Sequence, residues 1–274
     1  MARALRACFV LATLGALECG LFPSLDGLSS GEPDASPAPD ATTADAPGAD
    51  AADCGRWCDS LSPKPMFCDD FDDQGPLTRW TDQFVREDAS VGRDPSAFTS
   101  SPNALLALSP AAQNPSSALV YLETADTKSR VHVAYDMRID ARDPSVGYAE
   151  INYIHFDMSS VPFAIYLRVF DSTSSTSTIT SEAYLADGGI PAHDVPLSGS
   201  PRFDQWTQME IDIDLASTHT LSVTIDGQPA GSTALESNLY TPGPVKVDVG
   251  IGYTGYPTTG AWSIRYDNAT IDWQ

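Results

Sequence analysis

Alternation of apolar and polar residues is the feature that most constrains the fold of this chain. In RVHVAYDMRID (130–140), the odd-numbered residues from Val131 to Ile139 are apolar and the residues between them are mostly polar. Successive side chains of a strand point to opposite faces, so this pattern predicts a half-buried β-strand. FAIYLRVF (163–170) repeats the same pattern.

Further segments of this kind follow one another along the chain. Runs rich in Gly, Pro, Asn, Asp and Ser separate them, as is typical of turns. No long amphipathic helical pattern occurs after the first residues. About a dozen short strands in one domain predict an all-β fold, a β-sandwich of jelly-roll type. The segments are NALLALS, SALVYLE, YAEINYIHF, TITSEAYLA, HTLSVTIDG, VKVDVGIGY and AWSIRYDNATIDW.

Residues 1–19 predict an export signal. Arg3 and Arg6 precede a short apolar run, as in the charged and hydrophobic regions of a signal peptide, and that run is too short for a permanent membrane helix. Cys19 stands where a bacterial lipoprotein signal places its lipidated cysteine, although Glu18 replaces the usual small residue. Lipidation, plain cleavage and a misassigned start of the chain all stay open. We expect an exported protein, either a lipoprotein of the outer membrane or cell surface, or a periplasmic or secreted protein.

Residues 20–53 have a different composition, dominated by Ala, Asp, Pro, Gly, Ser and Thr, with seven acidic residues and no Lys or Arg. Such a segment cannot bury enough apolar surface to offset its conformational entropy. It predicts a disordered acidic linker before a folded domain at 54–274. The linker is either a tether that holds the domain away from a membrane or a spacer without a task of its own.

The charge balance excludes two classes of partner. The chain has 37 acidic and 15 basic residues, for a net charge of -22. Nucleic acids and anionic lipid surfaces are bound through clustered Lys and Arg. We therefore expect no nucleic-acid partner, and contact with a membrane only through a lipid anchor on Cys19.

Three cysteines lie close together after the linker, at Cys54, Cys58 and Cys68. In an oxidising compartment one pair is expected to form. We favour a Cys58–Cys68 disulfide across the Pro-containing loop, which leaves Cys54 without a partner. A zinc site is the weaker alternative, because metal-ligand spacing is absent and no His is near.

The order of several short motifs resembles a known fold family. FCDDFDD, VHVAYDMRID, the hairpin WTQMEIDIDLASTHTLSVTIDG and the closing RYDNATIDW are similar to a concanavalin A-like or laminin G-like domain, over roughly residues 66–274. The layout of signal, acidic linker and domain is similar to surface lipoproteins of bacteria. The resemblance implies a surface-displayed or periplasmic module that binds a glycan or a cell-envelope polymer. Because the family also includes glycosidases and adhesion modules, an enzyme and a structural module without a sugar site remain alternatives.

The strand MEIDIDL (209–215) bears on the enzyme alternative. Glycoside hydrolase family 16 has a strand with three alternating acids, so the resemblance implies Glu210 as nucleophile, Asp212 as its partner and Asp214 as acid/base. Retaining glycosidases place two carboxyl groups about 5–5.5 Å apart, whereas positions 210 and 214 are about 13 Å apart along a strand. Asp214 is also one methylene shorter than Glu. We therefore favour a solvated strand face, with the intervening apolar residues in the core.

A calcium site is a second hypothesis. In jelly rolls of this type the first and last strands are neighbours, which would bring Asp70 and Asp72 close to Asp267 and Asn268. Structural Ca²⁺ takes six to eight oxygen ligands. The alternative is that these carboxylates pair with Arg265 or with backbone N–H groups.

A polar sheet face and an aromatic loop are the candidate ligand-binding surfaces. Planar hydrogen-bonding groups and aromatic rings on a concave sheet suit a sugar, although the same residues could form an ordinary solvated face. In the loop GYTGYPTTGAW, Trp262 begins the last strand and is expected in the core. The candidate ligand-binding residues are Glu150, Asn152, Tyr166, Arg168, Glu182 and Tyr184 on the sheet, with Tyr253 and Tyr256 in the loop.

Overall fold

The computed structural model of the protein describes most of the predicted domain. The predicted signal, Cys19, the linker and Cys54 lie outside the described residues. All elements described here belong to one compact unit, Asp50–Gln274. The described residues are 56–73, 75–143, 147–156, 161–170 and 177–274.

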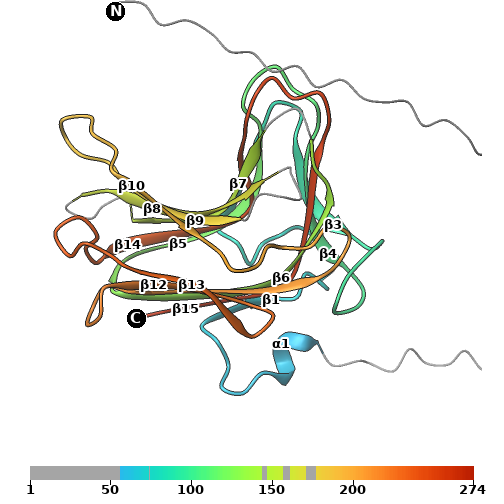
Figure 1. Cartoon of the computed structure of the whole chain (residues 1–274). Helices are drawn as coiled ribbons and strands as arrows, with labels where there is room; N and C mark the ends of the chain where they lie inside the picture. Colours follow the sequence, from blue (N-terminus) through green and yellow to red (C-terminus); the bar gives the residue numbers. More distant parts are fainter. Residues whose placement is uncertain (1–55, 74, 144–146, 157–160, 171–176) are drawn as a thin grey trace, which may run out of the picture. The chain divides into compact units, whose positions relative to one another are not determined.

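Two antiparallel sheets face each other (Figure 1), so the predicted jelly-roll β-sandwich is confirmed. The first sheet has eight strands in the order β13-β12-β11-β6-β15-β4-β3, with β1 also paired to β15. Its strands are β1 (Phe67–Asp69), β3 (Ser90–Asp94), β4 (Ala104–Ser109), β6 (Arg130–Ala141), β11 (Thr207–Asp214), β12 (Thr220–Ile225), β13 (Gln228–Ala234) and β15 (Trp262–Trp273).

The second sheet has seven strands in the order β10-β9-β8-β7-β14-β5-β2. Its strands bend strongly, and the face turned away from the first sheet lies on the inside of the bend (Figure 1). The helix α1 (Trp57–Ser60) is short, and the described residues include no helix that is long and apolar enough to cross a membrane. The strands are β2 (Asp82–Arg86), β5 (Ser117–Lys128), β7 (Tyr148–Phe156), β8 (Phe163–Phe170), β9 (Thr178–Ala183), β10 (Ala192–Pro196) and β14 (Gly243–Thr254).

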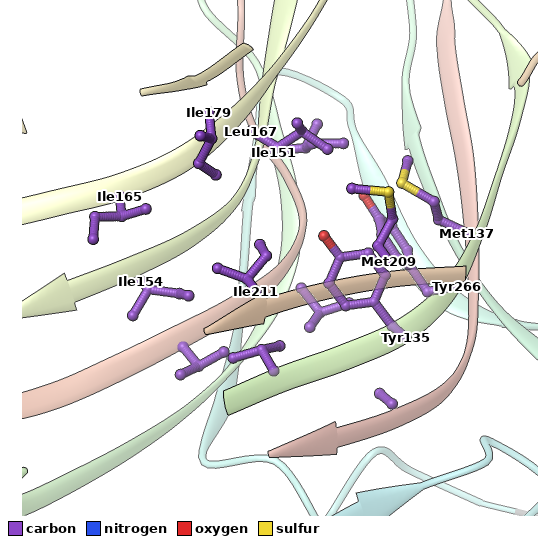
Figure 2. Close-up of a cluster of buried hydrophobic side chains, with 14 of the residues drawn as sticks. Tyr135, Met137, Ile151, Ile154, Ile165, Leu167, Ile179, Met209, Ile211 and Tyr266 are labelled. Carbon is purple, nitrogen blue, oxygen red and sulfur yellow. The ribbon is translucent and has the colours of Figure 1, made fainter. Parts of the chain in front are cut away.

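The core fills the space between the two inner faces, as the alternation predicts. On β6 the residues from Val131 to Ile139 alternate between buried and partly exposed, and Trp262 is fully buried as expected. Each large apolar side chain moved out of water contributes about 1.5–3 kcal/mol. Figure 2 shows side chains of the two sheets meeting, among them Tyr135, Met137, Met209, Ile211 and Tyr266 from one and Ile151, Ile154, Ile165, Leu167 and Ile179 from the other.

The N-terminal end of the described domain is joined to the last strand. β1 pairs with β15, with Cys68 opposite Thr270, so the expected adjacency of the first and last strands is confirmed. The predicted Cys58–Cys68 disulfide is also present, with an S–S distance of 2.02 Å. It links α1 to β1, and the backbone N–H of Cys58 donates to Asp70 Oδ2 at 3.3 Å.

A β-bulge in β7 decides which side chains face outward. The register between β7 and β8 shifts between Ile151 and Ile154, and Asn152 has a positive φ of 54°. Asn tolerates this conformation better than most residues, and a bulge inserts one extra residue into the strand. Beyond the bulge, the alternation of β7 is therefore shifted by one position.

Candidate functional site

Four of the predicted ligand-binding residues lie together on the outer face of the seven-stranded sheet. Arg168 Nη2 donates to Glu150 Oε1 at 2.9 Å and to the hydroxyl oxygen of Tyr166 at 2.8 Å. The Tyr166 hydroxyl in turn donates to Glu182 Oε1 at 2.7 Å. Burial and this hydrogen bond to a carboxylate raise the pKa of Tyr166. The network spans β7, β8 and β9 and holds its members in fixed positions.

Arg168 is held from several sides. Its guanidinium lies over the ring of Tyr148, 4.7 Å from the centroid, and its Nη1 lies 3.5 Å from Asp194 Oδ1 on β10, two strands away. A guanidinium over an aromatic face and between carboxylates is attracted to both. Its positive charge is thus balanced within the protein.

Asn152 does not belong to this face, and its placement corrects the prediction. The residue is 2% exposed. Its Nδ2 donates to the Tyr135 hydroxyl at 2.8 Å, and its Oδ1 accepts from the backbone N–H of Gly250 at 3.1 Å. Simple alternation places position 152 beside position 150, but the bulge turns it into the core.

Tyr153 and His155 occupy the outer face in its place, and the sequence analysis missed both. Their rings stack with centroids 5.1 Å apart, and Tyr153 also stacks on Tyr166 at 4.7 Å. The Tyr153 hydroxyl donates to Glu150 Oε2; burial, followed by the charge of Glu150, raises its pKa. The one signal in the sequence for the register shift of β7 is Asn152 itself, because Asn tolerates a positive φ better than most residues.

A cleft of about 550 Å³ opens where β5, β7 and β14 run side by side and β2 forms the edge. Within it, His155 Nε2 lies 3.2 Å from Asp248 Oδ2. Lys246 Nζ lies 3.7 Å from Asp248 Oδ1 and 5.3 Å from the centroid of the Tyr121 ring. The aromatic lining residues are Phe84, Tyr121, Tyr153 and Tyr253, and the polar ones are Glu123, His155, Lys246 and Asp248.

Gly252 on β14 makes room for one wall of this cleft. A Cβ at this position would collide with the edge of the Tyr153 ring. Gly in a strand often marks such a close approach. The position of Tyr153 therefore depends on a residue without a side chain on the neighbouring strand.

The remaining predicted tyrosines lie at or beyond the cleft. Tyr253 is one of its lining residues. Tyr256 is 54% exposed in the turn after β14, and Tyr184 is 39% exposed just after β9. The Tyr184 hydroxyl donates to Glu182 Oε2 at 3.4 Å, which connects it to the Arg168 network.

The four residues predicted to bind calcium lie near the junction of β1 and β15, and each of the three aspartates already accepts a hydrogen bond. Asp267 Oδ2 accepts from the backbone N–H groups of Thr99 at 2.7 Å and Ser100 at 2.8 Å. Asp72 Oδ1 accepts from the N–H of Asn103 at 3.1 Å, and Asp70 Oδ1 accepts from that of Asp72 at 3.4 Å. Across the described ranges, no group of three or more His, Cys, Asp or Glu side chains is arranged to hold a metal ion.

Two observations nevertheless leave room for a cation there. Burial of Asp72, and the repulsion of its charge by the carboxylates of Asp70 and Asp267, raise the pKa of Asp72 to about 6. Asn268 Oδ1 is buried and accepts no hydrogen bond from the described residues. Arg265, the alternative partner considered for these carboxylates, pairs with Asp94 and Asp140.

The three alternating acids of β11, Glu210, Asp212 and Asp214, lie on the outer face of the other sheet. Met209, Ile211 and Ile213 are buried, while the acids between them face outward. Asp214 Oδ1 accepts from the backbone N–H groups of Ala216 at 2.8 Å and Ser217 at 2.9 Å. These bonds lower its pKa, whereas a general acid needs a raised one. The arrangement is that of a solvated strand that leads into a turn.

Comparison with known proteins gives the fold and no family. No protein-family profile and no curated protein sequence matches the chain. Among solved structures, an endo-β-1,4-glucuronan lyase from the fungus Trichoderma reesei is similar with a TM-score of 0.59 and 13% identity, covering 77% of this chain and 96% of that one. The cellulose-induced protein Cip1 has a TM-score of 0.48 and 12% identity, with coverage of 75% and 96%. The similarity to the glucuronan lyase shows a shared jelly-roll β-sandwich.

Proposed function

We propose that this protein binds a glycan in the cleft on the outer face of the seven-stranded sheet. The observation that carries the proposal is the cleft itself, about 550 Å³ and lined by aromatic rings next to polar groups. Sugars are bound by such combinations, because rings cover their apolar faces and fixed polar groups meet their hydroxyls. The similar glucuronan lyase also acts on a glycan, by its name.

Pre-organisation of the cleft supports binding. Tyr153 stacks between His155 and Tyr166 and donates to Glu150. Side chains already fixed by neighbours lose little conformational entropy when a ligand arrives. We therefore place ligand binding at this surface ahead of a purely structural or adhesive module, and the product assays below decide between binding and catalysis.

A pull-down from polysaccharides and a glycan array, both with the full chain, test this proposal. The same mixtures are assayed for new reducing ends and for unsaturated, ultraviolet-absorbing products. We expect retention that is weakened by Tyr153→Ala and unchanged by Phe203→Ala, an exposed aromatic residue outside the cleft. No retention of any glycan would contradict the proposal.

The product assays decide between binding and catalysis. Release of reducing ends that stops in Glu210→Gln would make the acidic strand catalytic and support the family 16 alternative. Unsaturated products that stop in His155→Ala would make the cleft a lyase site. Binding without either product supports the binding module.

Export and lipid anchoring belong to the same proposal. The Cys58–Cys68 disulfide supports export, because disulfides persist mainly in oxidising compartments. Labelling of the expressed full chain with a fatty acid, compared with Cys19→Ser, tests the anchor. Label that is retained in the variant would contradict lipidation at Cys19.

Structural Ca²⁺ also remains a proposal. A cation near Asp70, Asp72 and Asp267 would relieve their repulsion, and Asn268 Oδ1 could join them as a ligand. Because a ligand that binds only the native state raises its melting temperature, Ca²⁺ added after chelation should raise the melting temperature. The same increase in Asp72→Asn would argue against this site.

A further inference from the structure

The outer face of the seven-stranded sheet has more carboxylates than cations. Among the residues that line the cleft or belong to the Arg168 network, three can be positively charged: Arg168, Lys246 and, when protonated, His155. Each lies within 4 Å of a carboxylate. The acidic groups of this surface are Glu123, Glu150, Glu182, Asp194 and Asp248.

This balance disfavours a polyanionic glycan. The strongest replacement for the hydration of a uronate or sulfate group is a charge-assisted hydrogen bond from an Arg or Lys that is not already paired. Arg168 is balanced by Glu150 at 2.9 Å and by Asp194 at 3.5 Å, and Lys246 is shared between Asp248 and the Tyr121 ring. A bound carboxylate would also meet the charges of the surrounding acids, which repel it.

Asp248 indicates what the cleft can attract instead. Its side chain is 4% exposed and lines the cleft. Its Oδ2 lies 3.2 Å from His155 Nε2, but within the described part of the chain its Oδ1 accepts no hydrogen bond. Lys246 Nζ, at 3.7 Å from Oδ1, is beyond hydrogen-bonding distance. A buried carboxylate oxygen without a donor is costly unless a water molecule or a ligand supplies one.

We propose that the cleft binds an amino-sugar glycan and that Asp248 Oδ1 accepts a hydrogen bond from the free ammonium group of one sugar unit. This inference rests on the proposed glycan-binding function and adds the chemical class of the glycan. An ammonium group supplies a donor for Oδ1, and it adds a positive charge to a group of residues in which carboxylates outnumber cations. The rings of Tyr121 and Tyr153 lie in the same cleft, where they can cover the apolar faces of the sugar units.

The test is a titration of the full chain with four oligosaccharides of equal length. They are a β-1,4-linked glucosamine oligomer, its fully N-acetylated form, a cello-oligosaccharide and a glucuronic acid oligomer. Asp248→Asn keeps the shape of the side chain and removes its charge. Asp212→Asn, on the outer face of the other sheet, removes the same charge at a distance and controls for general attraction of a polycation to a chain of net charge -22. Melting temperatures of both variants show whether they remain folded.

We expect the glucosamine oligomer to bind most tightly. Asp248→Asn should weaken this binding about tenfold or more, as is typical of a lost hydrogen bond to a charged group. Asp212→Asn should change it less than twofold. If Asp248→Asn fails to fold, competition by free glucosamine for the wild-type cleft, read from Tyr153 and His155 NMR signals, replaces it.

Other outcomes separate the two levels of the proposal. Preference for the N-acetylated, cello or glucuronic acid oligomer would overturn the amino-sugar inference and leave glycan binding intact. Equal losses in both Asn variants would show general electrostatic attraction and also overturn the inference. No binding of any oligosaccharide would contradict the glycan-binding function itself.

Discussion

Asn152 on β7 accepts a hydrogen bond from the backbone N–H of Gly250 on β14 at 3.1 Å, which joins irregular positions of two neighbouring strands. Both residues have positive φ, 54° and 136°. Asn152 also reaches across the core to the Tyr135 hydroxyl on the other sheet. The bulge is thus fixed by polar contacts within the core, and it turns Tyr153 and His155 toward the cleft.

Replacement of Asn152 by Ala should destabilise the domain. The change leaves the buried Tyr135 hydroxyl and the Gly250 N–H without these partners, and each such loss costs about 1–3 kcal/mol. We expect the free energy of unfolding in urea to fall by about 2–4 kcal/mol. Asn114→Ala is the matched control, because Asn114 is exposed and bonded only to Glu87 in the described structure. Equal stabilities of the two variants would contradict a structural role for the Asn152 contacts.

The bulge also shows where prediction from this sequence succeeds and where it fails. Regular alternation predicts the core faces of β6 and β11, because nothing interrupts the two-residue period there. On β7 one inserted residue reverses the faces, so simple counting selects Asn152 and misses Tyr153 and His155. This bulge is fixed by the contacts of Asn152 with Tyr135 and Gly250. Both residues belong to other strands, so the pattern of β7 alone does not reveal them.

The edge strands were missed for a related reason. β2, β3, β10 and β13 have no place among the sequence-predicted strands, and all residues of β2 are exposed. An edge strand has a partner on only one side, and its side chains can be polar on both faces. The hydrophobic period that reveals central strands is therefore weak or absent. Without β2 the cleft could not be predicted either, because β2 forms the edge of the sheet there and supplies the lining residue Phe84.

Loss of the disulfide should lower stability without removing the fold. Cys58 and Cys68 close a short loop, with a sequence separation of 10. By the chain-entropy estimate, such a cross-link contributes about 2–3 kcal/mol. We expect the double variant Cys58→Ser, Cys68→Ser to unfold at a lower urea concentration. Its free energy of unfolding should be about 2–3 kcal/mol below that of the wild type. A reducing agent should destabilise the wild type to a similar level and leave the double variant unchanged; equal sensitivity of both proteins would mean that this bond is absent in solution.

Asp72 should make the domain less stable as the pH rises. Burial, with the charges of Asp70 and Asp267, raises its pKa from an ordinary 3.8 to about 6 in the folded protein. Between these two values the folded state binds more protons than the unfolded state, so the contribution of Asp72 to stability falls with rising pH. Below 3.8 both states are protonated, and above 6 the loss is complete.

Melting curves of wild type and Asp72→Asn from pH 3.5 to 7.5, in the presence of a chelator, check this prediction. The melting temperature of the wild type should fall relative to the variant between pH 4 and 6. Asp59→Asn, at an exposed carboxylate on α1, should run parallel to the wild type. A wild-type curve that runs parallel to that of Asp72→Asn throughout would show that Asp72 has an ordinary pKa.

Substitution at Gly252 should separate ligand binding from folding. A Cβ at this position collides with the Tyr153 ring, so Gly252→Ala must displace that ring from its stack with His155 and Tyr166. Because the rings of Tyr153 and His155 line the cleft, we expect glycan affinity to fall about tenfold or more, equivalent to about 1.4 kcal/mol of binding free energy. The cost in stability should be smaller than for Asn152→Ala, since the ring can move toward solvent.

Gly92→Ala on β3 is the control, because a Cβ there meets no atom within 4 Å, and its affinity should match the wild type. Full affinity in Gly252→Ala would show that the ligand does not contact Tyr153 and would move the binding surface away from this cleft.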